Sequence, residues 1–352
     1  MIQGGAIAHR LGACALLAIM TQGLAGADVR PAPRDDAPTY ERSAPSLYHF
    51  WHSPNEPLEL IGANLSDGDR PLTGAQPAIQ EGNTLSAELF LRRTGVIPPE
   101  AKLQLHIQGT GPAYTGETAI DWEAMEPGGV YTLEMELRLP RLRYSGDAAL
   151  TVQALETEED PEPATLFTLP LLIEPDLVDS DIEAAKLREA FGETAQRLNH
   201  AVRLGPGAET RFPVSAEQQG EPWGGIGLVS RLEFSPHFER GQRVATLRLY
   251  RDGAVVKAMP VLANTHTAFG NRDYYPELAK RPPGALVFDS WDSGRPNEAG
   301  EPFDLYLFAG TFALPEPLEF DRIGLRYEAD IGLLEVRDVV LLPETNAVGE
   351  AP

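Results

Sequence analysis

The sequence almost lacks cysteine. Cys14 is the one cysteine among 352 residues, and it lies in a segment that we predict is removed on export. A mature chain without a thiol forms no disulfide, holds no zinc through cysteine and has no cysteine nucleophile. Its stability must therefore come from packing.

Long apolar runs and basic residues are also scarce. The apolar run Leu11–Met20 has about ten residues, whereas a membrane-spanning helix needs about 20, so we expect no membrane insertion. The chain has 29 basic and 52 acidic residues and a net charge of −23. No cluster of Lys or Arg offsets this charge in the sequence, which argues against nucleic acid and anionic membrane surfaces as partners.

Catalytic and cofactor motifs are missing as well. The sequence contains no Gly-x-Ser-x-Gly elbow, no phosphate-binding loop, no His-Glu-x-x-His and no dinucleotide fingerprint. We therefore assign no catalytic residue, no metal ligand and no cofactor, although paired carboxylates of a glycosidase would meet only in the fold. A structural calcium ion is an alternative that ordinary turns explain better; its oxygen ligands would be Asn64, Asp67 and Asp69, or Asp289 with Asp292.

Residues 1–27 have the pattern of a signal peptide. His9 and Arg10 precede the apolar run, and Ala25-Gly26-Ala27 forms a small-x-small cleavage site. We therefore expect a periplasmic or secreted protein that begins at Asp28. Lipidation of Cys14 is the competing interpretation, but this cysteine precedes most of the apolar run that it would have to follow.

Glycine and proline are plentiful, with 33 and 31 residues, as in proteins built from short strands and tight turns. Residues 28–46 are rich in proline and charge and predict a flexible leader, and 346–352 predict a disordered tail.

Residues 47–175 alternate apolar and polar side chains, which predicts an antiparallel β-sandwich. Residues 205–345 return to this texture and predict a second sandwich of jelly-roll type, with a hairpin at Arg251-Asp252-Gly253.

Residues 176–204 interrupt the alternation. Ser180 and Glu183 match a capping box. Apolar residues then recur at helical spacing at Leu187, Phe191, Leu198 and Val202. These features predict one amphipathic linker helix between two β domains, so that the whole protein is all-β apart from this helix.

Two stretches carry a resemblance to known modules. The segment Gly82–Leu91, with Pro98-Pro99 and Pro127-Gly128 after it, resembles the Ig-like module found beside jelly-roll domains in bacterial envelope polysaccharide-assembly proteins. The segments Gly227–Leu232, Val244–Tyr250 and Thr265–Phe269 are similar to those jelly rolls, which themselves resemble carbohydrate-binding modules. The resemblance implies a polysaccharide or oligosaccharide ligand and envelope assembly proteins as possible partners.

Candidate ligand-binding residues cluster in loops of the second domain. Sugars are bound by flat aromatic faces and by planar polar side chains that bridge hydroxyl groups. Both kinds of group occur between residues 264 and 295, and one more tryptophan stands beside two glycines. The predicted contacts are His266, Asn271, Arg272, Asp273, Tyr274, Tyr275, Trp291, Asp292 and Trp223.

Three functions remain open at this level. We expect an exported, non-catalytic protein that binds or helps to assemble an envelope or extracellular polysaccharide. The first alternative is an enzyme, either a glycoside hydrolase or a polysaccharide lyase that uses His266, Arg272 and Tyr274. The second is a structural scaffold in an envelope protein complex.

Cleavage after Ala27 is directly testable. The order of charged, apolar and small residues places the mature start at Asp28. The intact mass of the exported protein should match a chain that begins at this residue. A diacylglyceryl group on Cys14 would contradict the prediction.

Overall fold

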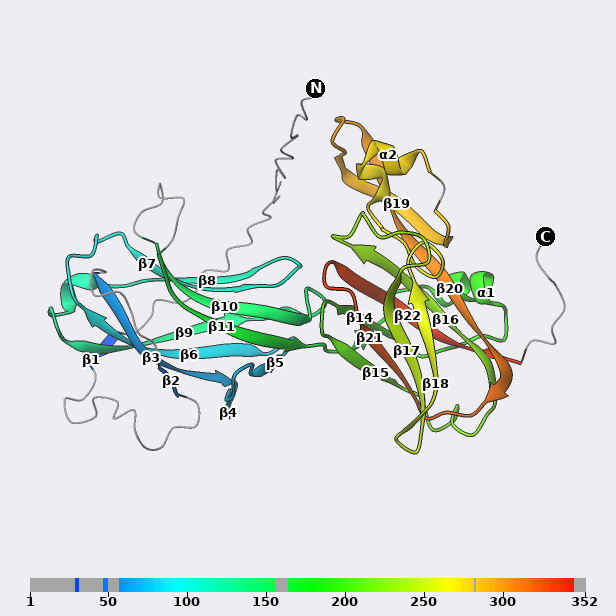
Figure 1. The fold of residues 1–352 in the computed structure, drawn as a ribbon, viewed down its shortest axis with the longest axis horizontal. Coiled ribbons are helices and arrows are strands. Elements are labelled where there is room, and N and C mark those ends of the chain that lie inside the picture. The colour runs from blue at the N-terminus through cyan, green and yellow to red at the C-terminus, as the bar shows by residue number, and fades with distance from the viewer. Residues whose placement is uncertain (1–28, 32–46, 50–56, 156–163, 282, 345–352) are drawn as a thin grey trace, which may run out of the picture.

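The fold comes from a computed structural model that describes residues 29–31, 47–49, 57–155, 164–281 and 283–344. The predicted signal peptide, Cys14 and the tail 346–352 lie outside these residues. Strands hold most of the described chain, so the prediction of an all-β protein is confirmed. Two β units lie end to end, the first at the left and the second at the right of Figure 1.

The first unit consists of two sheets whose strands alternate buried and exposed residues. The order of the first sheet is β1-β9-β6-β3-β2, with β4 paired to β3; its strands are β1 (Val29–Pro31), β2 (Leu47–His49), β3 (Leu58–Asp67), β4 (Arg70–Pro71), β6 (Thr84–Arg93) and β9 (Val130–Arg138). The order of the second is β5-β11-β10-β7-β8, made by β5 (Ala78–Gln80), β7 (Lys102–Gln108), β8 (Tyr114–Ala119), β10 (Gly146–Leu155) and β11 (Ala164–Glu174). A short helix, η1 (Trp122–Ala124), precedes β9.

The second unit pairs a seven-stranded sheet with a four-stranded sheet. The larger sheet has the order β12-β14-β22-β16-β20-β19, with β13 paired to β22; its strands are β12 (Val178–Asp179), β13 (Gln196–Arg197), β14 (His200–Leu204), β16 (Trp223–Glu233), β19 (Leu286–Pro296), β20 (Pro302–Leu318) and β22 (Leu333–Pro343). The smaller sheet has the order β15-β21-β17-β18, with β15 (Glu209–Pro213), β17 (Arg243–Arg251), β18 (Ala254–Leu262) and β21 (Arg322–Tyr327). The expected hairpin joins β17 to β18, and Asp252 and Gly253 both have positive φ, of 52° and 79°.

Two segments differ from the sequence-based expectation. The predicted helix over 176–204 is wrong: α1 covers only Ala184–Phe191, and most of the rest forms β12, β13 and β14. Gly192 ends the helix with a φ of 98°, and the capping box does not form, because Ser180 Oγ accepts a hydrogen bond from the Ile182 amide instead. In the leader, which was expected to be flexible, Val29–Pro31 pairs with β9 as β1.

The apolar spacing at 187–202 reflects burial against strands. Leu187 of α1 packs with Val229 and Val340 on the outer face of the seven-stranded sheet. Val202 belongs to β14 and points to the opposite face, into the core between the sheets. The apolar spacing that resembled one helix therefore comes from helix α1 and strand β14 together.

The two units meet through hydrogen bonds, which include those from Ser145 Oγ to Arg203 O and from Thr110 Oγ1 to Gly332 O, and through the side chain of Leu333. Gly205 donates its amide to Ser145 O at 2.6 Å, and Asp147 donates to Pro206 O at 2.7 Å. Leu333, although it lies on β22 of the second unit, is fully buried and packs in the core of the first. Its neighbour Leu334 points into the core of the second unit.

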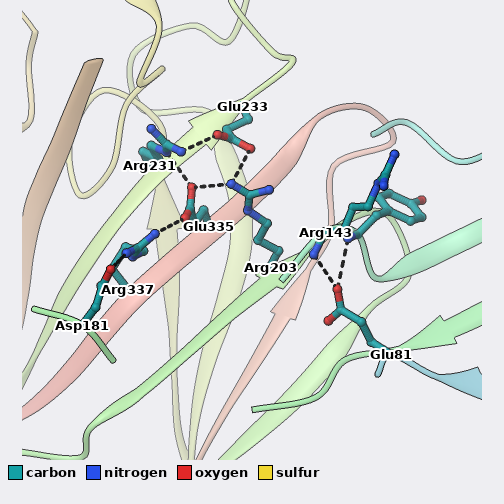
Figure 2. A network of polar contacts seen from close by, with 9 residues as sticks. Glu81, Arg143, Asp181, Arg203, Arg231, Glu233, Glu335 and Arg337 are labelled. Carbon is teal, nitrogen blue, oxygen red and sulfur yellow. Dashed lines mark hydrogen bonds and ion pairs between the residues drawn. The ribbon is translucent and has the colours of Figure 1, made fainter. Parts of the chain in front are cut away.

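Glu81 supports the first unit's side of this junction. Its Oε1 accepts hydrogen bonds from the amides of Arg143 at 2.6 Å and Tyr144 at 3.2 Å (Figure 2). Tyr144 is fully buried and donates its hydroxyl proton to Asp147 O. Burial raises the pKa of Glu81 to about 7, although those two hydrogen bonds act in the opposite direction.

Truncation of Leu333 tests the junction. We expect Leu333→Ala to lower the free energy of unfolding by about 2–5 kcal/mol, because a buried leucine leaves a cavity, and to speed amide hydrogen exchange in β7 and β10 of the first unit. Leu334→Ala is the matched control and should affect β16 and β17 instead. Equal effects of both variants on β7 and β10 would show that Leu333 has no separate role in the first core.

Candidate functional site

The loop between β18 and β19 is held against the end of β16. The Leu232 amide donates to Ala268 O at 2.8 Å, and the Gly270 amide donates to Leu232 O at 2.9 Å. The loop continues into two short helices, η2 (Arg272–Tyr274) and α2 (Pro276–Ala279), which lie beside β19 at the top of the second unit (Figure 1). Residues 264–281 and Gly284 thereby form one wall of a cleft.

The cleft has a volume of about 480 Å³. Its other wall is the segment 235–240 between β16 and β17. Apolar and polar groups share the lining: Leu232, Phe238, Ala268, Phe269, Leu278, His237, Glu239, Arg240, Asn264, Arg272 and Arg281 contribute to it, with Ser235, Pro236 and Gly284. An apolar hollow beside Trp122 in the first unit has only about 20 Å³ and is too small for a sugar.

Arg272 is the one predicted contact that lines the cleft. Its side chain is almost buried, donates to Leu278 O at 2.6 Å and lies 3.4 Å from Asp273 Oδ1. The segment 235–240 is not among the residues predicted from the sequence, although it lines the cleft. Its signal was the same mixture of aromatic, histidine and arginine residues that singled out the later loop.

Several other predicted contacts hold the loop in place. His266 Nδ1 accepts a hydrogen bond from the Leu262 amide at 3.1 Å, and its ring lies 4.4 Å from that of Phe312. Burial lowers the pKa of His266, so the neutral ring is favoured. Asp273 Oδ2 accepts the hydroxyl proton of Tyr306 at 2.5 Å.

Aromatic packing accounts for the paired tyrosines. The ring of Tyr274 lies 5.6 Å from Phe303 and 5.2 Å from Tyr275, and Tyr275 lies 5.9 Å from Phe269. Asn271, at the start of η2, is half-buried. Of His266, Arg272 and Tyr274, which the lyase alternative groups together, only Arg272 lines the cleft.

The two predicted tryptophan platforms have different outcomes. Trp223 is 2% exposed, packs in the core between the sheets and donates its indole proton to Gln218 O, so its assignment to a ligand is wrong. Its neighbours Gly224 and Gly225 pack closely against the backbone of the adjacent strands and do not open a surface for a ligand. Trp291 on β19 is 40% exposed, and its stacking role stays a prediction. Asp292 is exposed and accepts a hydrogen bond from the Gly294 amide at 2.8 Å.

A buried charge network lies beneath this region, on the outer face of the seven-stranded sheet (Figure 2). Glu335 of β22 is 1% exposed and sits 2.6 Å from Arg231, 3.2 Å from Arg203 and 2.9 Å from Arg337. Glu233 lies 2.7 Å from Arg231 and 3.6 Å from Arg203, and Asp181 pairs with Arg337. These residues alternate along their strands with core residues, which places their side chains on the opposite face.

The network also supports the loop that forms the cleft. A Cβ atom added at Gly270 would lie 2.6 Å from Arg231 Cδ, so only glycine lets the loop approach β16 this closely. The guanidinium carbon of Arg231 lies 5.4 Å from the centre of the Trp291 ring. Its Nη1 has no hydrogen-bond acceptor among the described residues, and the indole face takes that place.

Opposite effects set the two glutamate pKa values. Burial would raise the pKa of Glu335, but Arg203, Arg231 and Arg337 outweigh it and lower the pKa to about 2. For Glu233 burial prevails over Arg203 and Arg231 and raises the pKa. Glu335 is therefore the carboxylate that stays ionised at the centre of the network.

The suggested calcium ligands have other partners. Asp67 accepts hydrogen bonds from Arg70 and Asn83, both at 2.7 Å, and Asn64 donates to Glu88. Asp289 pairs with Lys186 of α1 at 2.6 Å. Within the described ranges, no three His, Cys, Asp or Glu residues gather as a metal site would require.

No family model and no curated protein matches the sequence. Among solved structures, the C-terminal domain of Wzt aligns with a TM-score of 0.26 and 12% identity, over 37% of this chain and 79% of that one. The Agl-KA catalytic domain aligns with a TM-score of 0.26 and 15% identity, over 44% of this chain and 23% of that one. In the described part of the chain, no helix is long and apolar enough to cross a membrane.

Neutralising Glu335 tests the network. Its folded pKa of about 2 lies below the ordinary value of 4.5, so it stabilises the fold above pH 4.5 and loses this effect as the pH falls toward 2. We expect Glu335→Gln to cost about 3–5 kcal/mol at pH 7, because buried arginines lose their partner, and clearly less at pH 3.

Urea unfolding at both pH values measures this difference. Glu328→Gln is the matched control, because Glu328 pairs with Arg243, whose side chain is 58% exposed. This surface pair should contribute less than about 1 kcal/mol. A cost for Glu335→Gln that is equally small, or independent of pH, would contradict the prediction.

Proposed function

We propose that this is an exported, non-catalytic protein that binds a glycan through its second unit. The observation that carries the proposal is the cleft between residues 235–240 and 264–284, which is large enough for one or two sugar rings at about 480 Å³. The described residues that line it provide both apolar surface and polar groups. This combination suits a ligand whose rings have C–H faces and hydroxyl edges.

The aromatic residues of the cleft, Phe238 and Phe269, are held in place by packing. Phe269 is 9% exposed and is anchored by Tyr275, and Phe238 packs partly against the core of the second unit. Asn264 has a φ of 53° and donates from Nδ2 to Phe238 O at 2.9 Å, so it joins the two walls. Because these contacts are made within the protein itself, little ordering would accompany binding.

We also propose that the first unit is Ig-like and the second a jelly roll. For the first unit, the support is the order β9-β6-β3 in one sheet and β11-β10-β7-β8 in the other, with β5 running parallel to β11 at the edge. For the second, it is two packed sheets of seven and four strands. In this arrangement the first unit acts as a spacer that presents the second. A periplasmic or secreted location follows from the predicted signal peptide.

A scaffold role is the second candidate. Edge strand β19 exposes Leu286, Val287 and Trp291 by 64%, 40% and 40%. An exposed apolar edge can pair with a strand of another protein. An envelope assembly protein would be the partner on this edge.

Binding and its location can be measured together. The mature chain is applied to a glycan array, and amide hydrogen exchange is recorded with the tightest ligand. We expect slower exchange in 235–241 and 264–281, and weaker binding by Trp291→Ala would add the stacking contact predicted for Trp291. Protection confined to β19, with affinity lost in Trp291→Ala, would place the site on the tryptophan. Binding to no glycan would contradict the proposal.

A further inference from the structure

The cleft concentrates positive charge in an otherwise acidic protein. Three guanidinium groups and one carboxylate line it, in a chain of net charge −23. The guanidinium groups belong to Arg240, Arg272 and Arg281, and the carboxylate to Glu239. They come from both walls, so a ligand between the walls would meet arginine on either side.

Two of these arginines have unused binding capacity. Arg240 and Arg281 are exposed, and neither forms an ion pair or side-chain hydrogen bond among the described residues. Some arginines of the same unit pair with nearby carboxylates, as Arg243 does with Glu328 and Arg248 with Glu209, whereas Arg322 and Arg326 form no ion pair among the described residues. What distinguishes Arg240 and Arg281 is that both line one cleft, each from a different wall.

Backbone geometry brings Arg240 to the opposite wall. A Cβ atom at Gly284 would lie 3.2 Å from Arg240 Nε and 2.1 Å from Asn264 O, so the absence of a side chain lets the walls approach. Gly241 follows Arg240 with a φ of 83° and donates its amide to Ala263 O at 2.9 Å. The arginine therefore projects from a turn that is tied to the loop across the cleft.

Arg272 contributes a fixed charge. Its hydrogen bond to Leu278 O and its contact with Asp273 hold the guanidinium group in one place. Asp273 offsets part of this charge, whereas nothing described offsets Arg240 and Arg281 in the same way. The exposed pair would therefore make the direct contacts, with Arg272 strengthening the local potential.

We propose that the cleft selects a saccharide that carries a carboxylate, as in an oligosaccharide containing uronic acid. Guanidinium groups bind carboxylates through paired, charge-assisted hydrogen bonds, and the Phe238 and Phe269 side would contact the sugar ring. This inference rests on the proposed function and names its ligand class. The net charge argues against nucleic acid and anionic membrane surfaces, but binding of a short acidic saccharide responds to the local arrangement of charge in the cleft.

The test compares acidic saccharides with their own neutral forms. The mature chain is titrated calorimetrically with oligogalacturonate, oligomannuronate, oligoguluronate and hyaluronan oligosaccharides, and with each after reduction of its carboxyl groups. Neutral cello-, malto-, xylo- and chito-oligosaccharides form a second set. We expect at least one acid to bind and its reduced form to bind about tenfold more weakly or worse.

Variants locate the charge that is responsible. Arg240→Gln and Arg281→Gln should each weaken binding of that acid about tenfold, and both should fold normally because the side chains are exposed. Arg322→Gln is the matched control. Arg322 is exposed and lies opposite Tyr250 in the pairing of β21 with β17, at the end of β17 that is far from the cleft. It should leave the affinity unchanged.

Each other outcome has a definite meaning. Binding of neutral saccharides with no preference for the acids overturns this inference and leaves glycan binding intact. Binding of an acid that Arg240→Gln and Arg281→Gln do not weaken overturns it too, because the carboxylate is then recognised elsewhere. Failure to bind any saccharide overturns both this inference and the proposed function.

Discussion

The position of Glu335 on β22 is the constraint on which the second unit depends. It is buried between Arg203 and Arg231 of the neighbouring strands, so β14, β22 and β16 must keep their register for its charge to be balanced. Arg231 then lies directly beneath Gly270, where the long loop crosses the sheet. Glu335 thereby fixes Arg231, and Arg231 in turn packs against Gly270 of the loop that forms one wall of the cleft.

The same strand connects three parts of the molecule. Leu333 enters the core of the first unit, Leu334 enters the core of the second, and Glu335 enters the charge network. Alternation along a strand sends neighbouring side chains to opposite faces, and here the junction lies at the strand's beginning. Leu333 of the junction and Glu335 of the charge network that supports the cleft loop are therefore near neighbours on β22.

Charge acts at two scales in this protein. Over the whole surface, 52 acidic residues favour solubility and repel polyanions at long range. Arg240 and Arg281 line the cleft and have no carboxylate partner in the part of the chain that the structure describes. A short acidic saccharide carries few charges into this setting, so local hydrogen bonding can outweigh the long-range repulsion, which salt screens.

The sequence by itself determined the all-β class, the hairpin at Asp252-Gly253 and a candidate region over 264–295, of which only Arg272 among the predicted contacts lines the cleft, because alternation, turn residues and side-chain chemistry are local properties. Only the tertiary structure showed that Leu198 and Val202 belong to the strand region rather than to a helix, since the same spacing arises when different elements pack on one sheet. It also buried Trp223 and brought residues 235–240 opposite Arg272. Burial and the meeting of distant loops depend on strand pairing, which the order of residues along the chain does not reveal.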